Sequence, residues 1–250
     1  MARGVLFDST LCVGCRECEG ACAKRWNNPY DESIANTEKI SYRKLTTIQT
    51  KGENFVRRMC MHCVDPACAS VCPVGALEKT KLGAVVYHED KCMGCRYCMV
   101  ACPFNVPSYT WNDPLPKVKK CDMCFERQSA GKPTACAEAC PTGATLLGER
   151  EELVAEAKKR LAEKPGEYHP KIYGLEEVGG TSVLFLSKVP FEQLGLRTDL
   201  PRHALPQNTW AVLSHVPDVA AMGSVLLGGV YWITHRREEV ARAEAKGGSR

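Results

Sequence analysis

Sixteen cysteines gathered in four short runs constrain the fold of this 250-residue chain more than any other feature of its sequence. The runs read CVGCRECEGAC, CMHCVDPACASVCP, CMGCRYCMVACP, and a split run that begins with CDMC and ends with CAEACP. Disulfide frameworks distribute their cysteines to join distant segments, whereas these runs place three thiols on one small loop. Structural zinc sites usually draw two cysteines from each of two loops. The spacing therefore disfavours both a disulfide framework and a zinc-stapled module.

The spacing C-x-x-C-x-x-C-x-x-x-C-P is the pattern of bacterial ferredoxins. In that pattern three thiolates hold one 4Fe-4S cluster and the fourth thiolate holds a neighbouring cluster. Sixteen ligands divide into four sets of four, so the sequence predicts four 4Fe-4S clusters. Gly14 and Gly94 suit the cluster loops, because glycine tolerates a positive φ and a close backbone approach. Three runs end in Cys-Pro, and only the first ends in Cys-Ala.

The sequence after the last cysteine of a run repeats as well, as CPVGALEK and CPTGATLL. A short apolar strand is expected at residues 84–87. Loop, helix and strand units that recur in this way predict an α+β fold of two pseudo-symmetric, double-cluster ferredoxin-like modules, followed by a C-terminal transmembrane helix. The expected domains are a four-cluster electron-transfer head at 1–148, a helix and strand capping segment with linker at 149–208, a transmembrane helix at 209–237, and a charged tail at 238–250.

Several segments resemble one known family. They are DSTLCVGC, MCMHCVDPACASVCPVGAL, GCRYCMVACPFNVPSY, CAEACPTGA, ELVAEAKKRLAEKPGEYHPKIYG and GGTSVLFLSKVPFEQLGL. Together they are similar to the four-cluster iron-sulfur subunits of respiratory formate dehydrogenases and of hydrogenase-2-type nickel-iron hydrogenases. The resemblance covers about residues 6–196, with a similar tail beyond. The second and third runs resemble the hydrogenase branch, and CFERQSAGKPTACAEACPTGA resembles the formate dehydrogenase branch.

The resemblance implies how the cysteines are shared, with the first run paired to the fourth and the second to the third. We name the four implied ligand sets by letter. Set A is Cys12, Cys15, Cys18 and Cys140, set B is Cys22, Cys121, Cys124 and Cys136, set C is Cys60, Cys63, Cys68 and Cys102, and set D is Cys72, Cys92, Cys95 and Cys98.

Four complete sets leave no iron with an open coordination position, which favours electron transfer over catalysis. The resemblance implies a non-catalytic subunit that relays electrons from a catalytic subunit to a quinone-reactive or cytochrome b membrane subunit. The catalytic subunit would be a molybdenum or tungsten formate dehydrogenase or a nickel-iron hydrogenase. The alternative is a free-standing polyferredoxin that carries electrons by diffusion.

The charge of the chain fits buried clusters and argues against nucleic acid as a partner. The formal net charge is only +4 and no basic run is long enough to bind a phosphate backbone. Each oxidised cluster with its four thiolates adds roughly −2, which calls for compensating cations. The cationic candidates beside the cysteine runs, either cluster-tuning or ordinary surface, are Arg57, Arg58, Arg96, Lys117, Lys119, Lys120, Arg127 and Lys132. His62 is either a donor to a cluster sulfur or a plain loop residue.

Three segments outside the runs have expected structures. Residues 24–58 contain few apolar side chains, and packing over the core is favoured there over an insertion that contacts a partner. EELVAEAKKRLAEKPG predicts a helix with Leu153, Val154, Ala157 and Leu161 on one side and a pair of Glu156 with Arg160. VLFL at residues 183–186 predicts a buried strand.

Residues 216–234 form a mostly apolar segment, about 28 Å long as a helix and close to the thickness of a bilayer core. Pro217 and Asp218 suit its first turn. A buried helix is the alternative to a membrane span. The arginine-rich HRREEVARAEAK places the C-terminus in the cytoplasm and the head in the periplasm by the positive-inside rule. MARGVLFDST has no room for a signal peptide before the first ligand, so export together with a signal-bearing catalytic partner is expected.

Overall fold

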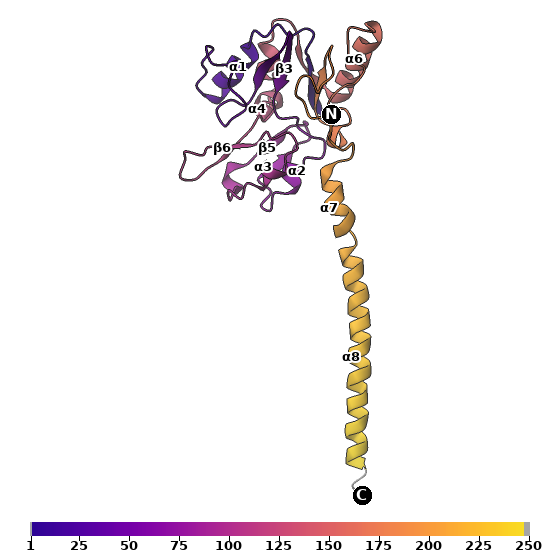
Figure 1. Ribbon diagram of the computed structural model, residues 1–250. Helices are drawn as coiled ribbons and strands as arrows, with labels where there is room; N and C mark the ends of the chain where they lie inside the picture. The colour runs from indigo at the N-terminus through magenta and orange to yellow at the C-terminus, as the bar shows by residue number, and fades with distance from the viewer. Residues whose placement is uncertain (1, 248–250) are drawn as a thin grey trace. The chain divides into compact units, whose positions relative to one another are not determined.

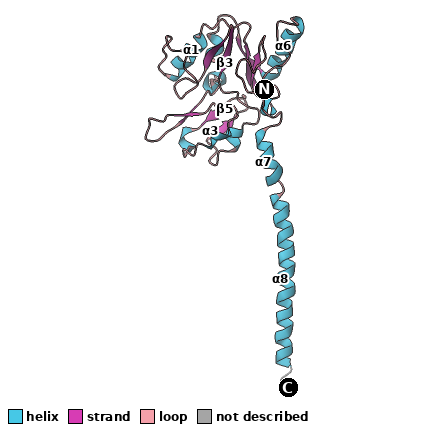
Figure 2. Cartoon of the chain, in the orientation of Figure 1, coloured by secondary structure: helices cyan, strands magenta, loops and turns pink. Residues whose placement is uncertain are grey.

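The computed structural model of the protein describes residues 2–247. The chain divides into two compact units, Met1–Pro206 and Gln207–Arg250, here called the head unit and the C-terminal unit. The head unit mixes short helices with short strands, as Figures 1 and 2 show. This composition agrees with the predicted α+β class.

The first strand of the chain, β1, is the central strand of a three-stranded sheet in the order β8–β1–β9. Strand β1 (Arg3–Asp8) pairs antiparallel with β8 (Thr145–Glu149) and parallel with β9 (Val183–Leu186). All four residues of β9 are buried, which confirms the predicted strand. A continuous apolar run of this kind is typical of a strand that is covered on both faces.

Helix α6 (Arg150–Glu163) covers one face of this sheet and confirms the predicted helix. Its side chains Leu153, Val154 and Ala157 form one apolar cluster with Leu6 and Leu184 of the sheet. Leu161 packs at the edge of the cluster, and Arg160 Nε donates to Glu156 Oε1 at 2.8 Å as the spacing predicts. The helix therefore packs on the sheet with the apolar face that its sequence pattern predicts.

The remaining elements of the head unit are short. They are α1 (Glu17–Trp26), β2 (Thr47–Lys51), β3 (Asn54–Arg58), α2 (Ala67–Ser70), β4 (Leu77–Lys79), β5 (Val85–Tyr87), η1 (Glu89–Lys91), α3 (Tyr97–Ala101), β6 (Ser108–Tyr109), β7 (Val118–Lys119), α4 (Phe125–Ser129), α5 (Ala135–Glu138) and η2 (Glu177–Gly179). Strand β5 confirms the strand expected at 84–87.

Two strand ladders bring the cysteine runs together in pairs. Strand β1 precedes the first run, and its partner β8 follows the fourth run. Strand β5 precedes the third run, and its partner β4 follows the second run. The helices repeat this pairing, because α1 packs against α5 and α2 against α3. In Figure 1 α2, α3 and β5 lie together in one part of the head unit, and α1, α4 and β3 in another.

The segment at residues 24–58 packs over the core, as favoured from its sequence. Strands β2 and β3 form an antiparallel hairpin in which Thr47 faces Arg58. Leu45, Ile48 and Val56 of this segment are buried in the main apolar cluster of the head. Its few apolar residues are therefore used for packing.

The C-terminal unit is helical, with α7 (Leu205–Leu213) followed by α8 (Val216–Gly247). Pro217 and Asp218 lie in the first turn of α8, as predicted. The helical segment Leu205–Ala245, with a turn at residues 214–215 between α7 and α8, is long and apolar enough to cross a membrane, with a mean hydropathy of 1.4 over its best 18 residues. The arginine-rich residues 235–247 continue α8 rather than leaving it.

Candidate iron-sulfur cluster sites

The residue before the second cysteine has a left-handed backbone in all four runs. Its φ is +70° at Gly14, +48° at His62, +76° at Gly94 and +54° at Met123. Residues other than glycine adopt this conformation at a cost of about 1–2 kcal/mol. The four loops therefore share one backbone turn, and two of them keep it with a residue that it strains.

The third cysteine of each run lies in the first turn of a short helix. Arg16 and Arg96, both left-handed, immediately precede α1 and α3, and Cys18 and Cys98 in those helices are buried. In the second and fourth runs the third cysteine lies in the first turn of α2 and of α5. The loops thus present two cysteines before the helix and a third at its start.

The four cysteines of set B line a single pocket. Cys22 lies on α1, Cys121 and Cys124 precede α4, and Cys136 lies on α5. Arg57 of β3 lines the same pocket. The fold therefore brings together thiols that are about a hundred residues apart in the chain.

Within set A, and separately within set D, the charge of one thiol affects the pKa of another thiol from the partner run. Burial raises the pKa of Cys12, and the charge of Cys140 acts in the same direction. Burial also raises the pKa of Cys98, and the charge of Cys72 adds to the effect. Since such effects weaken with distance, Cys140 lies near Cys12 and Cys72 lies near Cys98, as sets A and D require.

Set C shows the same arrangement. Burial raises the pKa of Cys63, followed by the charges of Cys60, Cys102 and Cys68. All members of the set contribute, including Cys102, which comes from the third run. The second and third runs therefore meet in the head unit.

The spacing of the thiol groups bears on the kind of metal centre that they could hold. Within residues 2–247, no group of three or more His, Cys, Asp or Glu side chains is close enough to hold one ion. A zinc ion needs its four sulfurs at about 2.3 Å, and hence in mutual contact. All sixteen cysteines are free thiols, so they form no disulfide framework. The irons of a cubane cluster spread their four ligand sulfurs further apart than a single ion does.

Comparison with known proteins agrees with this chemistry. The 4Fe-4S dicluster domain family matches residues 50–150. A protein of Nitratidesulfovibrio vulgaris is 40% identical over 96% of this chain and 69% of its own length. The hydrogenase-2 operon protein HybA of Escherichia coli O157:H7 is 43% identical over 80% of this chain and 73% of its own. The nitrate-inducible formate dehydrogenase iron-sulfur subunit of Escherichia coli K12 is 35% identical over 72% and 66%, respectively. The chain belongs to this family of iron-sulfur subunits.

Two buried donors beside the cysteine loops of this iron-sulfur subunit have no protein acceptor. The His62 ring is fully buried, and its Nδ1 accepts the backbone N–H of Val85 at 2.9 Å. The proton of the neutral ring therefore lies on Nε2, which has no partner among the described residues. Arg57 Nη2 is unpartnered in the same way. Buried donors require acceptors, and cluster sulfides and thiolates are acceptors, so the sites fit iron-sulfur clusters.

The cations near the cysteine runs divide by burial. Arg57 is 1% exposed and Lys120 is 4% exposed, whereas Lys132 and Arg96 are exposed. Arg127 forms an ion pair with Glu138 near the surface. Arg58 binds the backbone carbonyls of Leu194 and Gly195, while Lys117 and Lys119 are partly exposed. Only Arg57 and Lys120 of the candidates therefore act within the low-dielectric interior, and the others are surface or packing residues.

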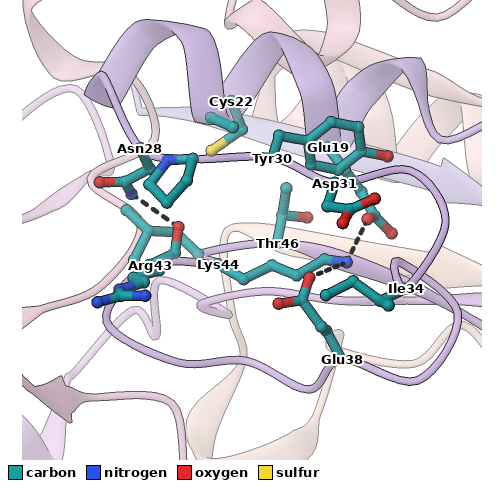
Figure 3. Close-up of a pocket in the computed structure, with 13 residues that line it drawn as sticks. Glu19, Cys22, Asn28, Tyr30, Asp31, Ile34, Glu38, Arg43, Lys44 and Thr46 are labelled. Atoms are coloured by element: carbon teal, nitrogen blue, oxygen red, sulfur yellow. Dashed lines mark hydrogen bonds and ion pairs between the residues drawn. The ribbon is translucent and has the colours of Figure 1, made fainter.

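A pocket of about 210 Å³ beside Cys22 shows how residues 24–58 are held on α1 (Figure 3). Lys44 Nζ lies 2.7 Å from Glu19 Oε2 and 3.2 Å from Glu38 Oε2. Glu19 and Lys44 are both buried, at 2% and 7% exposure. Without Lys44, the nearest cation to the buried Glu19 carboxylate would be Arg16 at 3.9 Å, so the Glu19–Lys44 ion pair fixes the segment next to a cysteine of set B.

Sequence reasoning missed Lys79 as a partly buried cation near set C. Its Nζ donates to His62 O at 2.9 Å and to Gly83 O at 2.8 Å. Burial lowers the pKa of Lys79 to about 8, against the opposing charges of Cys63 and Cys60. Lys79 stands seven residues beyond the last cysteine of its run, so no spacing signal marks it. Only the β4–β5 ladder brings it back to the cluster loop.

Proposed function

We propose that this chain relays electrons from a catalytic subunit that oxidises hydrogen or formate to a quinone-reactive membrane subunit. The observation that carries the proposal is that the fold joins the four cysteine runs in pairs, the first with the fourth and the second with the third, which supports the four proposed sets of four ligands. Bound in these sets, 4Fe-4S clusters supply centres that accept and donate single electrons. No set lacks a ligand, so the chain contributes no open iron for substrate turnover.

We infer that the head consists of two modules, one holding sets A and B and the other holding sets C and D. The β1–β8 ladder and the contact of α1 with α5 support the first module. The β4–β5 ladder and the contact of α2 with α3 support the second. We also propose the domain limits given from the sequence: 1–148 for the four-cluster head, 149–208 for the capping segment and linker, 209–237 for the transmembrane helix and 238–250 for the charged tail.

We further propose the order A, B, C, D for the relay. Burial and the charge of Cys136 raise the pKa of Cys18 to about 11, which supports contact between sets A and B. Burial and several neighbours including Cys60 raise the pKa of Cys121, which supports contact between sets B and C.

Contact between sets C and D has the same kind of support. Burial, the charge of Cys60 and the charge of Cys98 raise the pKa of Cys68 to about 12. The end loops are the open ones, with Cys15 of set A exposed and Met93 of the set D loop 66% exposed. Electrons would therefore enter and leave at the two ends of the row.

The C-terminal helix supports attachment to a membrane. We propose that α8 crosses the bilayer once, with the arginine-rich end in the cytoplasm and the head in the periplasm. The apolar residues Leu226, Leu227 and Trp232 are 66–68% exposed and would face lipid or a membrane partner. A free-standing polyferredoxin has no use for such a helix, so the membrane-bound relay is favoured over the diffusing carrier.

Hydrogenase is the favoured catalytic partner. The identity is 43% with the hydrogenase-2 operon protein and 35% with the formate dehydrogenase subunit. The test is purification of the intact assembly from its native membrane in mild detergent, followed by metal analysis. The expected result is an assembly that contains nickel as well as about sixteen irons per copy of this chain, from its four 4Fe-4S clusters. Molybdenum or tungsten would identify a formate dehydrogenase instead. Zinc in place of iron, or a chain that purifies alone without detergent, would overturn the relay.

A further inference from the structure

Arg57 is a permanently charged side chain in the interior of the head. It lies near the end of β3 and is 1% exposed. It is the largest of the fully buried side chains among the described residues. An arginine guanidinium keeps its positive charge at every pH at which a protein is folded.

This charge has no carboxylate partner among the described residues. Arg57 Nε donates to Thr46 Oγ1 and Nη1 donates to Thr145 Oγ1, both at 3.0 Å. Both acceptors are neutral hydroxyls, Nη2 makes no hydrogen bond that meets normal geometry within residues 2–247, and the side chain interacts with the Cys136 thiol. A buried charge without a counter-charge costs several kcal/mol. The structure thus holds the guanidinium rigidly at a place where only the cysteine sites can balance it.

Arg57 faces both sets of the first module. It lines the pocket of set B together with Cys22 and Cys136. Thr145, which anchors Nη1, begins β8 just after the last cysteine of set A. The position between the two sets is therefore fixed by the β1–β8 sheet and by the β2–β3 hairpin.

We propose that Arg57 is a positioning cation shared by the clusters of sets A and B, and that it raises the reduction potentials of both. The inference rests on the ligand sets of the proposed function. Reduction adds one negative charge to a cluster, and a fixed cation in a low-dielectric interior stabilises that charge. Arg57 Nη2 is the donor available to a sulfur acceptor of these sites.

The test is a potentiometric titration of the complete assembly in detergent, with each cluster followed by electron paramagnetic resonance. Arg57→Met removes the charge and Arg57→Gln keeps an amide donor, so both neutral variants are titrated. We expect two of the four clusters to become harder to reduce by at least tenfold in the ratio of reduced to oxidised cluster, about 59 mV. Arg57→Lys keeps the charge and is expected to restore most of the shift.

Arg127→Met is the matched control, because Arg127 stands beside the fourth run but pairs with Glu138 at the surface. It is expected to shift every potential by less than either neutral variant of Arg57 does. Cys18→Ser and Cys136→Ser assign the signals of sets A and B. Four clusters whose potentials stay unchanged in the neutral Arg57 variants, or shift equally, would overturn the role of Arg57 alone. A wild-type assembly without four such signals would instead overturn the proposed function.

Discussion

Single residues in this iron-sulfur subunit hold conformations that their residue type does not prefer. His62 and Met123 take up the same left-handed turn as Gly14 and Gly94. His62 lies in the second cysteine run, and its Nδ1 accepts a hydrogen bond from the N–H of Val85 at the start of β5, which holds the loop against the β4–β5 hairpin. Tertiary contacts therefore compensate the local strain.

The two glycines of the repeated turn offer a matched pair of substitutions. Both have a positive φ, so Gly94→Ala and Gly14→Ala each introduce strain of about 1–2 kcal/mol. A Cβ at Gly94 meets no atom within 4 Å, whereas one at Gly14 would lie 2.4 Å from Phe55 Cε1. We expect Gly94→Ala to keep its full iron content and Gly14→Ala to lose iron from set A, measured as iron per chain. Equal iron loss in both variants would contradict the steric argument.

The buried carboxylate of Asp8 supports a prediction about stability. Arg160 Nη1 donates to Asp8 Oδ2 at 2.9 Å, and Asp8 is fully buried. Arg160→Met leaves this carboxylate without a cation and should lower the free energy of unfolding by about 3 kcal/mol. Lys159→Met on the same helix breaks only an exposed pair with Glu163 and should cost less than about 0.5 kcal/mol. Urea titrations of the two variants measure the difference, and similar losses would refute it.

Secondary-structure elements decide which cysteines meet. The runs themselves are local loops, but the ladders that precede and follow them join the first run to the fourth and the second to the third. An element of only three residues, β4 or β5, can do this because its partner is its immediate neighbour in the chain. The β1–β8 ladder closes a much longer loop and uses five residue pairs.

A break in the shorter ladder tests this account of the elements. Val86 faces Glu78 in the β4–β5 ladder and is buried. Val86→Pro removes its N–H from the hairpin and should release the clusters of sets C and D, about half of the iron. Val86→Ala keeps the backbone ladder and is the control, with iron content close to the parent protein. Iron loss spread evenly over all four clusters in the proline variant would count against two modules.

On the scale of the whole molecule, the head unit and the helical C-terminal unit differ in where their apolar side chains lie. The head unit has its own apolar clusters, which contain several of the cysteines. The C-terminal unit exposes Val225, Leu226 and Ile233 along α8. A helix with this composition is stable in contact with lipid or with another apolar helix.

A charge placed in the apolar part of α8 tests membrane insertion. Leu226→Asp should make insertion less favourable by about 2.5–3.5 kcal/mol and move the chain from the membrane pellet to the soluble fraction after alkaline extraction. Ala243→Asp lies on the same helix beyond the apolar stretch and should leave the chain in the pellet. Retention of both variants in the membrane would mean that a partner subunit, rather than α8, holds this chain there.

The sequence by itself determined the features that depend on local spacing. These are the four cysteine runs, the turn at the two glycines, helix α6, strands β5 and β9, and the start and apolar length of α8. Tertiary structure alone decided the burial of Arg57, the ring orientation of His62 and the return of Lys79 to the second run. Each of these depends on contacts that sequence spacing does not encode, such as the bond of Arg57 to Thr145, 88 positions away. The burial of a side chain and the groups that surround it depend on residues that folding brings together from distant parts of the chain, so no local pattern encodes them.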